Sequence, residues 1–399
     1  MNIVLVSPGQ PSLNPRLLKE ADALDEAGYT VTVLYGYWNQ WATEFDKQLF
    51  EKKRWKAVRV GGDPVNSKRT YNQSRLIYKI AKKLFKIFPL FFVDRAIGRN
   101  SSYLIKEAKK YRADLYIAHN LGALPAVVKA AAKYSAKCAF DAEDFHRNEV
   151  SNSSDSNDAL IKTQIEKKYF PNLDYLSASS PLIASAYVDL FPALHPEVIL
   201  NVFPTDKRVS RPAQNNNSPI KLFWFSQTIG HSRGLEEVII ALEGLDKGLF
   251  ELHLLGQIDP GFNIGSKTGI CFHEPVPPDE VIHFASQFDI GLAVETGFPL
   301  NRDICLTNKI FTYIQAGLCV VATDTSAQSQ LMNEYAGIGK IYPKNDPLAL
   351  ANVLSYYNQY RDELFKARST AFEAGKRKLN WENESKKLLN QVKRTLSPK

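Results

Sequence analysis

The stretch that most constrains the fold is residues 307–324, with the sequence TNKIFTYIQAGLCVVATD. Apolar side chains recur at helical spacing between residues 310 and 314, which predicts a helix with one buried face. Gly317 stands where a helix ends in the left-handed conformation that glycine adopts without steric cost. The apolar run at residues 320–322 is typical of a parallel strand covered on both faces. The stretch therefore predicts a helix that leads directly into a buried strand.

The start of this predicted helix is a candidate phosphate site. Thr307 can cap the helix, and the free backbone N–H groups of the first turn attract anions. Asn308 adds an amide and Lys309 a cation beside those groups. In the alternative interpretation, Lys309 only caps or solvates the helix end.

Strand-like and helix-like segments alternate along both halves of the chain. In the first half the pattern predicts strands at 3–7, 30–34, 115–118, 137–141 and 175–178 and helices at 15–27, 70–111 (broken at Pro89), 123–134 and 161–169. In the second half it predicts strands at 221–225, 251–255, 290–294 and 320–322 and helices at 234–245, 278–287, 308–316, 347–360 and 381–396. This alternation favours parallel sheets wrapped by helices, an α/β fold class.

Length and composition favour two domains. A chain of 399 residues is too long for one ordinary core. Residues 205–218 have the composition of a linker, with a proline and the polar run QNNNS. We therefore expect domains at residues 1–204 and 219–379.

Charge is unevenly distributed along the chain. The net charge is +8, yet residues 51–112 carry 18 Lys and Arg against 4 Asp and Glu, so the remainder is net negative. A basic region confined to one segment indicates an anionic partner. Residues 78–92 alternate lysines with large apolar side chains, which suggests a peripheral contact with anionic lipid. The alternative is a core-facing helix with solvated lysines.

Several function classes lack their signatures. We find no signal peptide, no membrane-spanning apolar run, no Gly-x-Gly-x-x-Gly or Gly-Lys-Ser/Thr loop, and no nucleic-acid motif. The cysteines lack metal-ligand spacing, and no Asp-x-Asp triplet occurs. We expect a cytoplasmic protein without a nucleic-acid partner, which lies at most peripherally on the inner face of the plasma membrane.

The pattern Asn-Lys-apolar-Phe-x-Tyr-x-x-Ala-Gly at residues 308–317 resembles the donor-binding helix of GT-B glycosyltransferases, the family 4 type in particular. Residues 14–34, 119–125 and 140–144 resemble acceptor-side segments of the same family, in order. The resemblance implies two Rossmann-like domains facing each other across a cleft. The first would bind the acceptor and the second the nucleotide-sugar donor. A final helix at residues 380–396 would cross back to the first domain.

For the donor side, the resemblance implies that Thr307, Asn308, Lys309 and Arg233 hold the nucleotide diphosphate. Gln227 stands where the family carries a second cation. A solvated Arg233 at a helix start is the alternative.

The family's two glutamates, eight positions apart, fall on Ile304 and Thr312, so this chain departs from the pattern. Asp303 and Glu295 lie nearby, and either is a candidate ligand for a sugar or ribose hydroxyl; we take Asp303 as a catalytic candidate and Glu295 as a donor-binding candidate.

For the acceptor side, His119 ends a predicted strand, and its family counterpart lies close to the donor sugar. Glu143 stands where the family often has histidine, and is a candidate general base of an inverting transfer, or a candidate hydroxyl ligand. Asn14 and Arg16 are expected to face the acceptor, with Arg16 meeting an anionic group. The alternatives are a core or capping histidine and an ordinary helix start with Pro15 at its first position.

The resemblance implies a retaining transfer of a sugar from a nucleotide-sugar to a glycan or lipid-linked acceptor, as in bacterial cell-surface polysaccharide biosynthesis. It implies no cofactor and no metal. Two alternatives remain open: a nucleotide-sugar epimerase of the same fold, which needs no acceptor, and a non-catalytic sugar- or nucleotide-binding protein.

Overall fold

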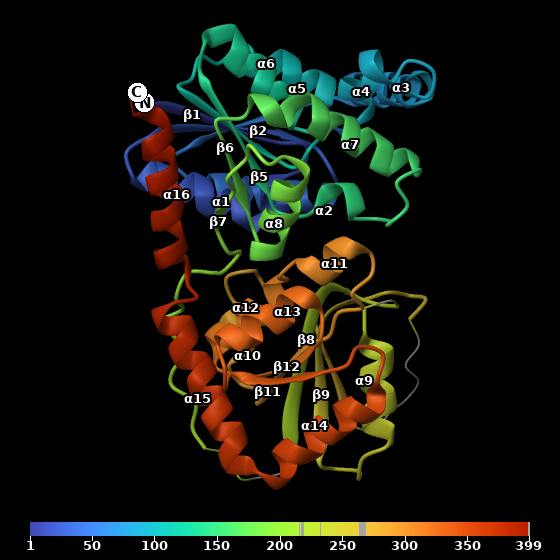
Figure 1. Cartoon of the computed structure of the whole chain (residues 1–399), viewed down its shortest axis with the longest axis vertical. Helices are drawn as coiled ribbons and strands as arrows, with labels where there is room; N and C mark the ends of the chain where they lie inside the picture. The colour runs from blue at the N-terminus through green and yellow to red at the C-terminus, as the bar shows by residue number, and fades with distance from the viewer. Residues whose placement is uncertain (215, 217–218, 232, 263–268, 398–399) are drawn as a thin grey trace. The chain divides into compact units, whose positions relative to one another are not determined.

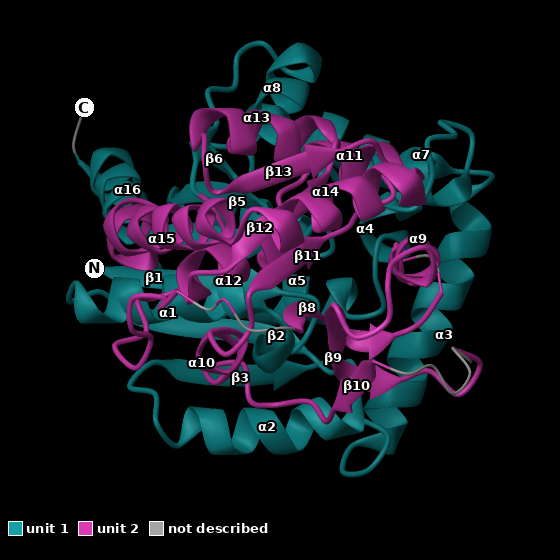
Figure 2. Ribbon diagram, turned by 90° about the horizontal axis from the view of Figure 1, so that it is seen from below, with its two compact units in different colours: residues 1–199, 385–399 teal, residues 200–384 magenta. Residues whose placement is uncertain are grey.

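The computed structural model describes residues 1–214, 216, 219–231, 233–262 and 269–397. The chain divides into two compact units, which Figure 2 colours separately: Met1–Ile199 with Ser385–Lys399, and Leu200–Glu384. The predicted linker at 205–218 lies partly outside the described residues. Its described residues form no helix or strand.

The first unit is built on a parallel sheet with strand order β3-β2-β1-β4-β5-β6-β7. Figure 1 labels β1, β2, β5, β6 and β7 of this sheet. Strand β1 lies inside the sheet and pairs with β2 and β4, so that Val4 lies opposite Thr32 on one side and Tyr116 on the other. Its strands are β1 (Asn2–Ser7), β2 (Thr30–Gly36), β3 (Lys56–Val60), β4 (Leu115–His119), β5 (Lys137–Ala142), β6 (Tyr175–Ala178) and β7 (Glu197–Val198). The apolar side chains of β1 and β4 are buried, as in a sheet covered on both faces.

Helices connect these strands in the order expected of parallel crossovers. The helices of this unit are α1 (Pro15–Glu26), α2 (Gln40–Phe50), α3 (Lys68–Phe85), α4 (Pro89–Ala96), α5 (Ser101–Ala108), α6 (Leu124–Tyr134), α7 (Asn157–Tyr169) and α8 (Pro181–Leu190), with 3-10 turns at Pro11–Leu13, His146–Asn148 and Phe170–Asn172. The last helix, α16 (Trp381–Leu396), also packs here through its second part, since Arg394 Nη2 donates to Glu197 Oε2 at 3.0 Å.

The second unit repeats the plan around a parallel sheet with strand order β10-β9-β8-β11-β12-β13. The strands are β8 (Ile220–Ile229), β9 (Phe250–Ile258), β10 (Ile270–His273), β11 (Ile290–Ala293), β12 (Cys319–Thr323) and β13 (Gly339–Tyr342). The helices are α9 (Leu235–Glu243), α10 (Val281–Ala285), α11 (Leu300–Ile304), α12 (Asn308–Ala316), α13 (Ser326–Glu334), α14 (Pro347–Gln359) and α15 (Arg361–Arg377). The core of this unit gathers on β8, β9, β11 and β12, with Trp224 and Leu292 fully buried.

The helix and strand that the sequence most clearly predicts are present as α12 and β12. Gly317 ends α12 at φ +72, the left-handed conformation that the pattern required. A Cβ at Gly291 would lie 2.2 Å from the Tyr313 ring, so this glycine lets α12 pack directly on β11. The Tyr313 hydroxyl donates to the Leu292 carbonyl at 3.2 Å and ties the two elements together.

The structure also contains elements that periodicity did not reveal. These are α2, β3, α8, β7, β10, α11, α13, β13 and α15. The predicted helix at 70–111 is divided twice, at Pro89 as expected and again between α4 and α5. Most of the missed elements are short or lie at sheet edges, where a polar face weakens the hydrophobic pattern.

Candidate functional site

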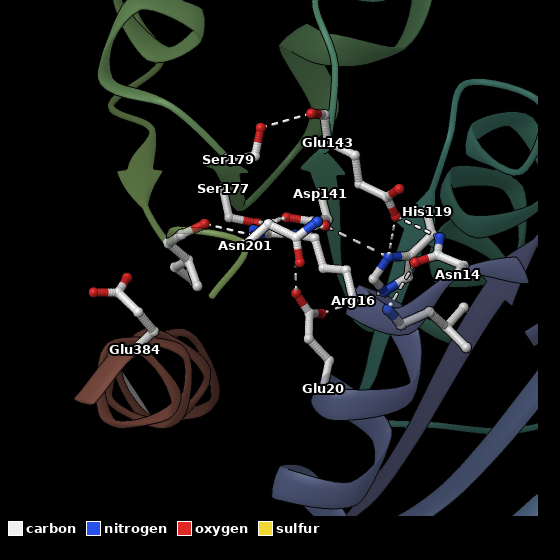
Figure 3. Close-up of polar contacts among 12 residues, drawn as sticks. Asn14, Arg16, Glu20, His119, Asp141, Glu143, Ser177, Ser179, Asn201 and Glu384 are labelled. Atoms are coloured by element: carbon white, nitrogen blue, oxygen red, sulfur yellow. Dashed lines mark hydrogen bonds and ion pairs between the residues drawn. The ribbon is translucent and has the colours of Figure 1, made fainter. Parts of the chain in front are cut away.

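Polar side chains gather at one edge of the first sheet, where β1, β4 and β5 end (Figure 3). His119 is the last residue of β4, while Asp141 lies near the end of β5 and Glu143 just beyond it. Asn14 and Arg16 lie at the start of α1, which follows β1. Because carboxyl ends of neighbouring parallel strands share one edge, the fold brings these residues together.

The centre of the cluster is a buried ion pair between Arg16 and Asp141. Arg16 donates from Nε to Asp141 Oδ2 at 2.5 Å and from Nη2 to Oδ1 at 2.7 Å, and its Nη1 donates to the Ile199 carbonyl at 2.6 Å. The Ser177 hydroxyl donates to Asp141 Oδ1 at 2.6 Å. Burial by itself raises the pKa of the Asp141 carboxyl, but Arg16, His119 and the Ser177 hydroxyl together outweigh burial and hold that pKa below its ordinary value.

His119 is fully buried among three carboxylates. Its Nδ1 lies 3.1 Å from Glu143 Oε1 and 3.5 Å from Asp141 Oδ2, and its Nε2 lies 3.3 Å from Glu20 Oε2. Burial lowers the pKa of the imidazole, but Glu20 and Glu143 more than offset burial and raise the pKa to about 10. The raised pKa favours the imidazolium form of His119, in which both ring nitrogens carry protons and face carboxylates.

Glu20 is the least satisfied member of the cluster. Among the described residues, neither of its carboxylate oxygens has a hydrogen-bond partner. The 3.3 Å contact with His119 is an ion-pair distance without hydrogen-bond alignment. Burial and the neighbouring Asp141 raise the pKa of the Glu20 carboxyl. Although Glu20, His119 and Asp141 could together face a metal ion, Arg16 already holds both oxygens of Asp141.

Glu143 is the carboxylate of the cluster that reaches solvent, since its side chain is 25% exposed. Its Oε1 accepts from Asn14 Nδ2 at 2.5 Å and contacts His119, and its backbone carbonyl accepts from the Ser179 hydroxyl at 2.6 Å. The carboxylate is thus fixed from two sides, and no contact to Oε2 is found among the described residues, so this oxygen is available to a ligand. Asn14 is also the cap of α1, because its Oδ1 accepts from the Leu17 N–H at 2.9 Å.

Two expectations for this edge require correction. Arg16 was expected to meet an anionic acceptor, but it is 1% exposed and its anionic partner is Asp141. His119 was expected near the donor sugar, but it is 0% exposed and surrounded by carboxylates of the same unit. The place of a residue at a strand end determines where its backbone lies. The side chains that pack around it determine whether its own side chain is exposed to solvent.

In the second unit, the start of α12 has the features of an anion site. Thr307 has the extended backbone of an N-cap, but its side chain makes no capping bond. Its hydroxyl oxygen is buried and has no hydrogen-bond partner in the described part of the chain. Asn308 Oδ1 accepts from Asn201 Nδ2 at 2.8 Å.

Lys309 and Glu295 form an ion pair beside this helix start. The Lys309 Nζ donates to Glu295 Oε1 at 2.5 Å and lies 5.9 Å from the centroid of the Trp224 ring. Glu295 follows β11, and its backbone N–H and carbonyl both bond to the Thr323 hydroxyl at 3.0 Å. The two candidate donor ligands are therefore in contact with each other.

Arg233 lies in the loop between β8 and α9. Its Nη1 donates to the Ser226 hydroxyl at 2.8 Å, which turns the guanidinium back towards the end of β8. Gly234 begins α9 at φ +82, and a Cβ there would lie 3.0 Å from Val294. Since β8 and β11 are neighbours, Arg233 and Glu295 belong to the same edge of the second sheet.

Asp303, proposed from sequence as a catalytic carboxylate, has a structural partner. Its carboxylate accepts from the backbone N–H of Ser326 at 3.3 Å and from the Ser326 hydroxyl, at the start of α13. Asp303 thus caps α13, which differs from the role expected for it.

The sequence interpretation missed Glu20 and Ser177. Glu20 lies one helical turn after Arg16, so the i, i+4 spacing of an acid and a base on α1 was the available signal. Nothing local marks Ser177, because it reaches Asp141 only through the pairing of β5 with β6.

Comparison with known proteins identifies the fold. The chain matches no protein-family model, and it matches no curated protein sequence. Among solved structures, it is similar to Alr3699/HepE of Anabaena in complex with UDP, with a TM-score of 0.69, 15% identity and coverage of 99% of this chain and 100% of that chain. It is also similar to the sucrose-phosphate synthase of Thermosynechococcus elongatus, with a TM-score of 0.67, 14% identity and 99% coverage of both chains.

A third similar structure is the lipopolysaccharide outer core galactosyltransferase WaaB, with a TM-score of 0.59, 11% identity and coverage of 98% of this chain and 99% of that chain. These likenesses extend over nearly the whole chain. Together with the two parallel sheets, they show that the protein has the GT-B fold of glycosyltransferases. The fold expected from the sequence is therefore confirmed.

Proposed function

We propose that the protein is a retaining glycosyltransferase that moves a sugar from a nucleotide-sugar to a glycan or lipid-linked acceptor in cell-surface polysaccharide biosynthesis. The observation that carries this proposal is the cationic edge of the second sheet at the start of α12. It belongs to a chain whose fold matches, along its whole length, a protein solved with UDP-glucose.

On the donor side, we assign Lys309, Arg233 and the first turn of α12 to the diphosphate. The bond between the sugar and the diphosphate breaks during transfer, and negative charge builds up on the leaving oxygen. Cations and helix N–H groups stabilise that charge. Lys309 must exchange Glu295 for phosphate, so Glu295 holds the lysine in place before the donor binds. These groups supply the positive charge without a metal, and we propose a metal-independent reaction without a cofactor.

On the acceptor side, we assign Glu143 to the attacking hydroxyl. Asn14 and His119 fix its Oε1, so the carboxylate presents Oε2 in one orientation. A carboxylate held in this way can accept a hydrogen bond from a hydroxyl and orient it for attack, while the hydroxyl proton passes to the departing diphosphate oxygen on the same face of the sugar, so that the anomeric configuration is retained. His119, Asp141 and Arg16 position Glu143 rather than touch the substrate.

The donor assignment is tested by thermal shift with UDP, GDP, ADP and TDP and their sugars. A ligand that binds only the native state raises the melting temperature. We expect one nucleotide to raise it, and the Arg233→Ala/Lys309→Ala double variant to lose most of that shift. As a matched control, Arg208→Ala removes another cation of the same unit and should keep the full shift. If no nucleotide raises the melting temperature, the donor assignment is wrong.

An assay without acceptor distinguishes glycosyl transfer from epimerisation. An epimerase converts its nucleotide-sugar alone, whereas a transferase needs an acceptor to release nucleotide at a sustained rate. Proton NMR of the product then gives the anomeric configuration, and inversion would refute the retaining assignment.

We also propose that α3 and α4 rest on the inner face of the plasma membrane, with the protein in the cytoplasm. No described helix has the length and apolar character needed to cross a bilayer. The helices do expose large apolar side chains, with Phe91 81% and Leu90 70% exposed. Exposed lysines accompany them at positions 79, 82, 83 and 86. Apolar side chains flanked by lysines are suited to anionic lipid.

Vesicle sedimentation tests this surface. Changing Lys79, Lys82, Lys83 and Lys86 to glutamine should weaken binding to phosphatidylserine vesicles by at least about tenfold, because each lysine near an anionic surface contributes about 1 kcal/mol. A control with the same charge change at the exposed lysines of α15 and α16 should bind as wild type; its positions are Lys366, Lys376, Lys386 and Lys393. Equal loss in both variants would show only a net-charge effect and refute the surface.

A further inference from the structure

A cluster of exposed aromatic side chains follows β2, on the first unit. Trp38 is 71% exposed, Trp41 52% and Phe45 48%. The rings of Trp41 and Phe45 meet edge to face with centroids 5.8 Å apart. We call these three residues the aromatic platform. Large exposed aromatic groups on a folded protein usually mark a binding surface, because water contact with apolar rings is unfavourable.

The backbone beneath the platform is rigidly held. Gln10 is 0% exposed, and its Oε1 accepts from the N–H groups of Trp38 at 2.9 Å and Asn39 at 2.8 Å. Its Nε2 donates to Thr43 Oγ1 at 3.2 Å and Asp46 Oδ2 at 2.9 Å. All four hydrogen bonds of one buried amide thus fasten the loop and the first turns of α2 to the segment after β1. A fixed backbone presents exposed rings in a defined orientation, which reduces the entropy lost on binding.

The platform lies on the same sheet edge as the candidate acceptor residues. It follows β2, Asn14 follows β1, and Glu143 follows β5, in a sheet where β2, β1, β4 and β5 are consecutive neighbours. With strands about 4.8 Å apart, the ends of β2 and β5 are separated by roughly 14 Å. A ligand held at Glu143 and extended along this edge towards the end of β2 would approach the loop and helix that carry the platform.

The charge around the platform distinguishes it from the α3 and α4 surface. On α2, Glu44 and Lys47 pair with each other at 2.9 Å and leave the helix surface near neutrality. Flat aromatic faces without a basic surround are suited to the apolar face of a sugar ring rather than to anionic lipid.

Resting on the proposed transfer function, we propose that the aromatic platform is a sugar-binding subsite for a glycan acceptor. Trp38 and Trp41 stack against sugar rings that lie beyond the one that reacts. This makes the acceptor an oligosaccharide or the glycan part of a longer chain, and it makes the two tryptophans determinants of acceptor specificity.

Tryptophan fluorescence can report on this platform directly. Of the five tryptophans, Trp55, Trp224 and Trp381 are at most 8% exposed, so Trp38 and Trp41 dominate quenching by acrylamide. The probes are cellohexaose, maltohexaose and chitohexaose. We expect at least one to lower the quenching constant about twofold. If none of the three protects the tryptophans, the proposal is overturned.

Single variants test whether the protection comes from stacking. In isothermal titration, Trp38→Ala and Trp41→Ala should each raise the Kd of the protecting hexasaccharide by about tenfold or more, because each change removes a large apolar ring face from contact with the sugar. Trp38→Phe should retain most of the affinity, and Phe91→Ala should leave it unchanged. Unchanged affinity in both alanine variants would overturn the proposal.

Two further measurements distinguish the sugar-binding proposal from the transferase proposal and from the membrane-contact proposal. The UDP thermal shift should be the same in Trp38→Ala as in wild type, so a missing shift in wild type counts against the transfer function while sugar protection still supports the platform. If phosphatidylserine vesicles rather than hexasaccharides protect Trp38 and Trp41 from acrylamide, the surface is a membrane contact and the sugar proposal is wrong.

Discussion

At the residue scale, the edge of the first sheet shows how one exposed carboxylate is supported by buried charges. Arg16, Asp141, His119 and Glu20 are all at most 1% exposed, while Glu143 reaches solvent. Buried charges are costly unless they are paired, so the cluster is stable only as a set. Its geometry fixes Glu143 before any ligand arrives.

Removing one partner of the central ion pair should therefore be severe. Arg16→Met leaves the Asp141 carboxylate buried without its guanidinium, and we expect a loss of about 3–5 kcal/mol in the free energy of unfolding. Urea denaturation followed by circular dichroism measures this. The control is Lys47→Met, which breaks an exposed pair on α2 and should cost less than about 1 kcal/mol. Comparable losses in the two variants would contradict the account of the cluster.

Stability should also depend on the protonation of His119. The pKa of this imidazole is raised from 6.5 to about 10 in the folded protein. A raised pKa contributes stability that is fully present below about pH 6.5 and is lost as the pH rises through about 10. Lys19, whose pKa is lowered to about 7, contributes with the opposite sign.

Comparing variants isolates the histidine from the lysine. The free energy of unfolding, measured by urea titration at pH 6, 7, 8 and 9, should fall more steeply with pH in wild type than in His119→Gln. Parallel curves would show that the imidazolium does not stabilise the fold.

At the element scale, α12 is defined by how it ends and where it begins. Gly317 ends it in a left-handed conformation, and a Cβ there would lie 2.8 Å from Pro212 Cγ. At its start, Thr307, Asn308 and Lys309 surround the free N–H groups that the proposed diphosphate would use. A substitution that alters either end of α12 would shift this helix relative to β11 and β12.

Gly317→Ala should destabilise the protein by more than the cost of backbone strain. The left-handed conformation costs an alanine about 1–2 kcal/mol, and contact with Pro212 adds to this. Gly28 is the matched control, because it has φ +88 and a Cβ added there would meet no atom within 4 Å, so that Gly28→Ala meets only the backbone strain. Thermal denaturation of both variants gives the comparison, and an equal loss would show that Pro212 moves aside freely.

At the scale of the whole molecule, the two units divide the proposed work. The candidate donor residues all belong to Leu200–Glu384, and the candidate acceptor residues to the unit formed by Met1–Ile199 and Ser385–Lys399. The GT-B fold places each set on the edge of its own parallel sheet. Each set can therefore be tested separately.

Hydrogen exchange should locate the donor site in the second unit. With saturating UDP, we expect slower exchange in peptides covering the start of α12 and the segment from Ser226 to Arg233, because bound ligand suppresses local opening. Peptides covering α6 should exchange at an unchanged rate and serve as the internal reference. Protection confined to the first unit would show that the nucleotide binds there, and would contradict the assignment of the donor site to the second unit.

The sequence predicted the alternating strands and helices, the α12–β12 unit with Gly317 at its turn, and the GT-B fold. The strands, helices and the turn at Gly317 depend on local periodicity and on residues with special backbone preferences, which can be recognised in a linear pattern, whereas the GT-B fold was implied by the resemblance to a known family. The sequence also placed His119, Glu143, Asn14 and Arg16 near one sheet edge, because strand ends can be counted along the chain.

Only the tertiary structure decided which of these residues face solvent. Arg16 and His119 became buried because Asp141 and Glu20, which lie far apart along the chain, meet them inside the first unit. Gln10 and the exposed Trp38 became linked in the same way, through contacts between segments after two different strands. Burial and pairing depend on these long-range neighbours, so the roles of charged and aromatic side chains follow from the packed structure rather than from the sequence pattern.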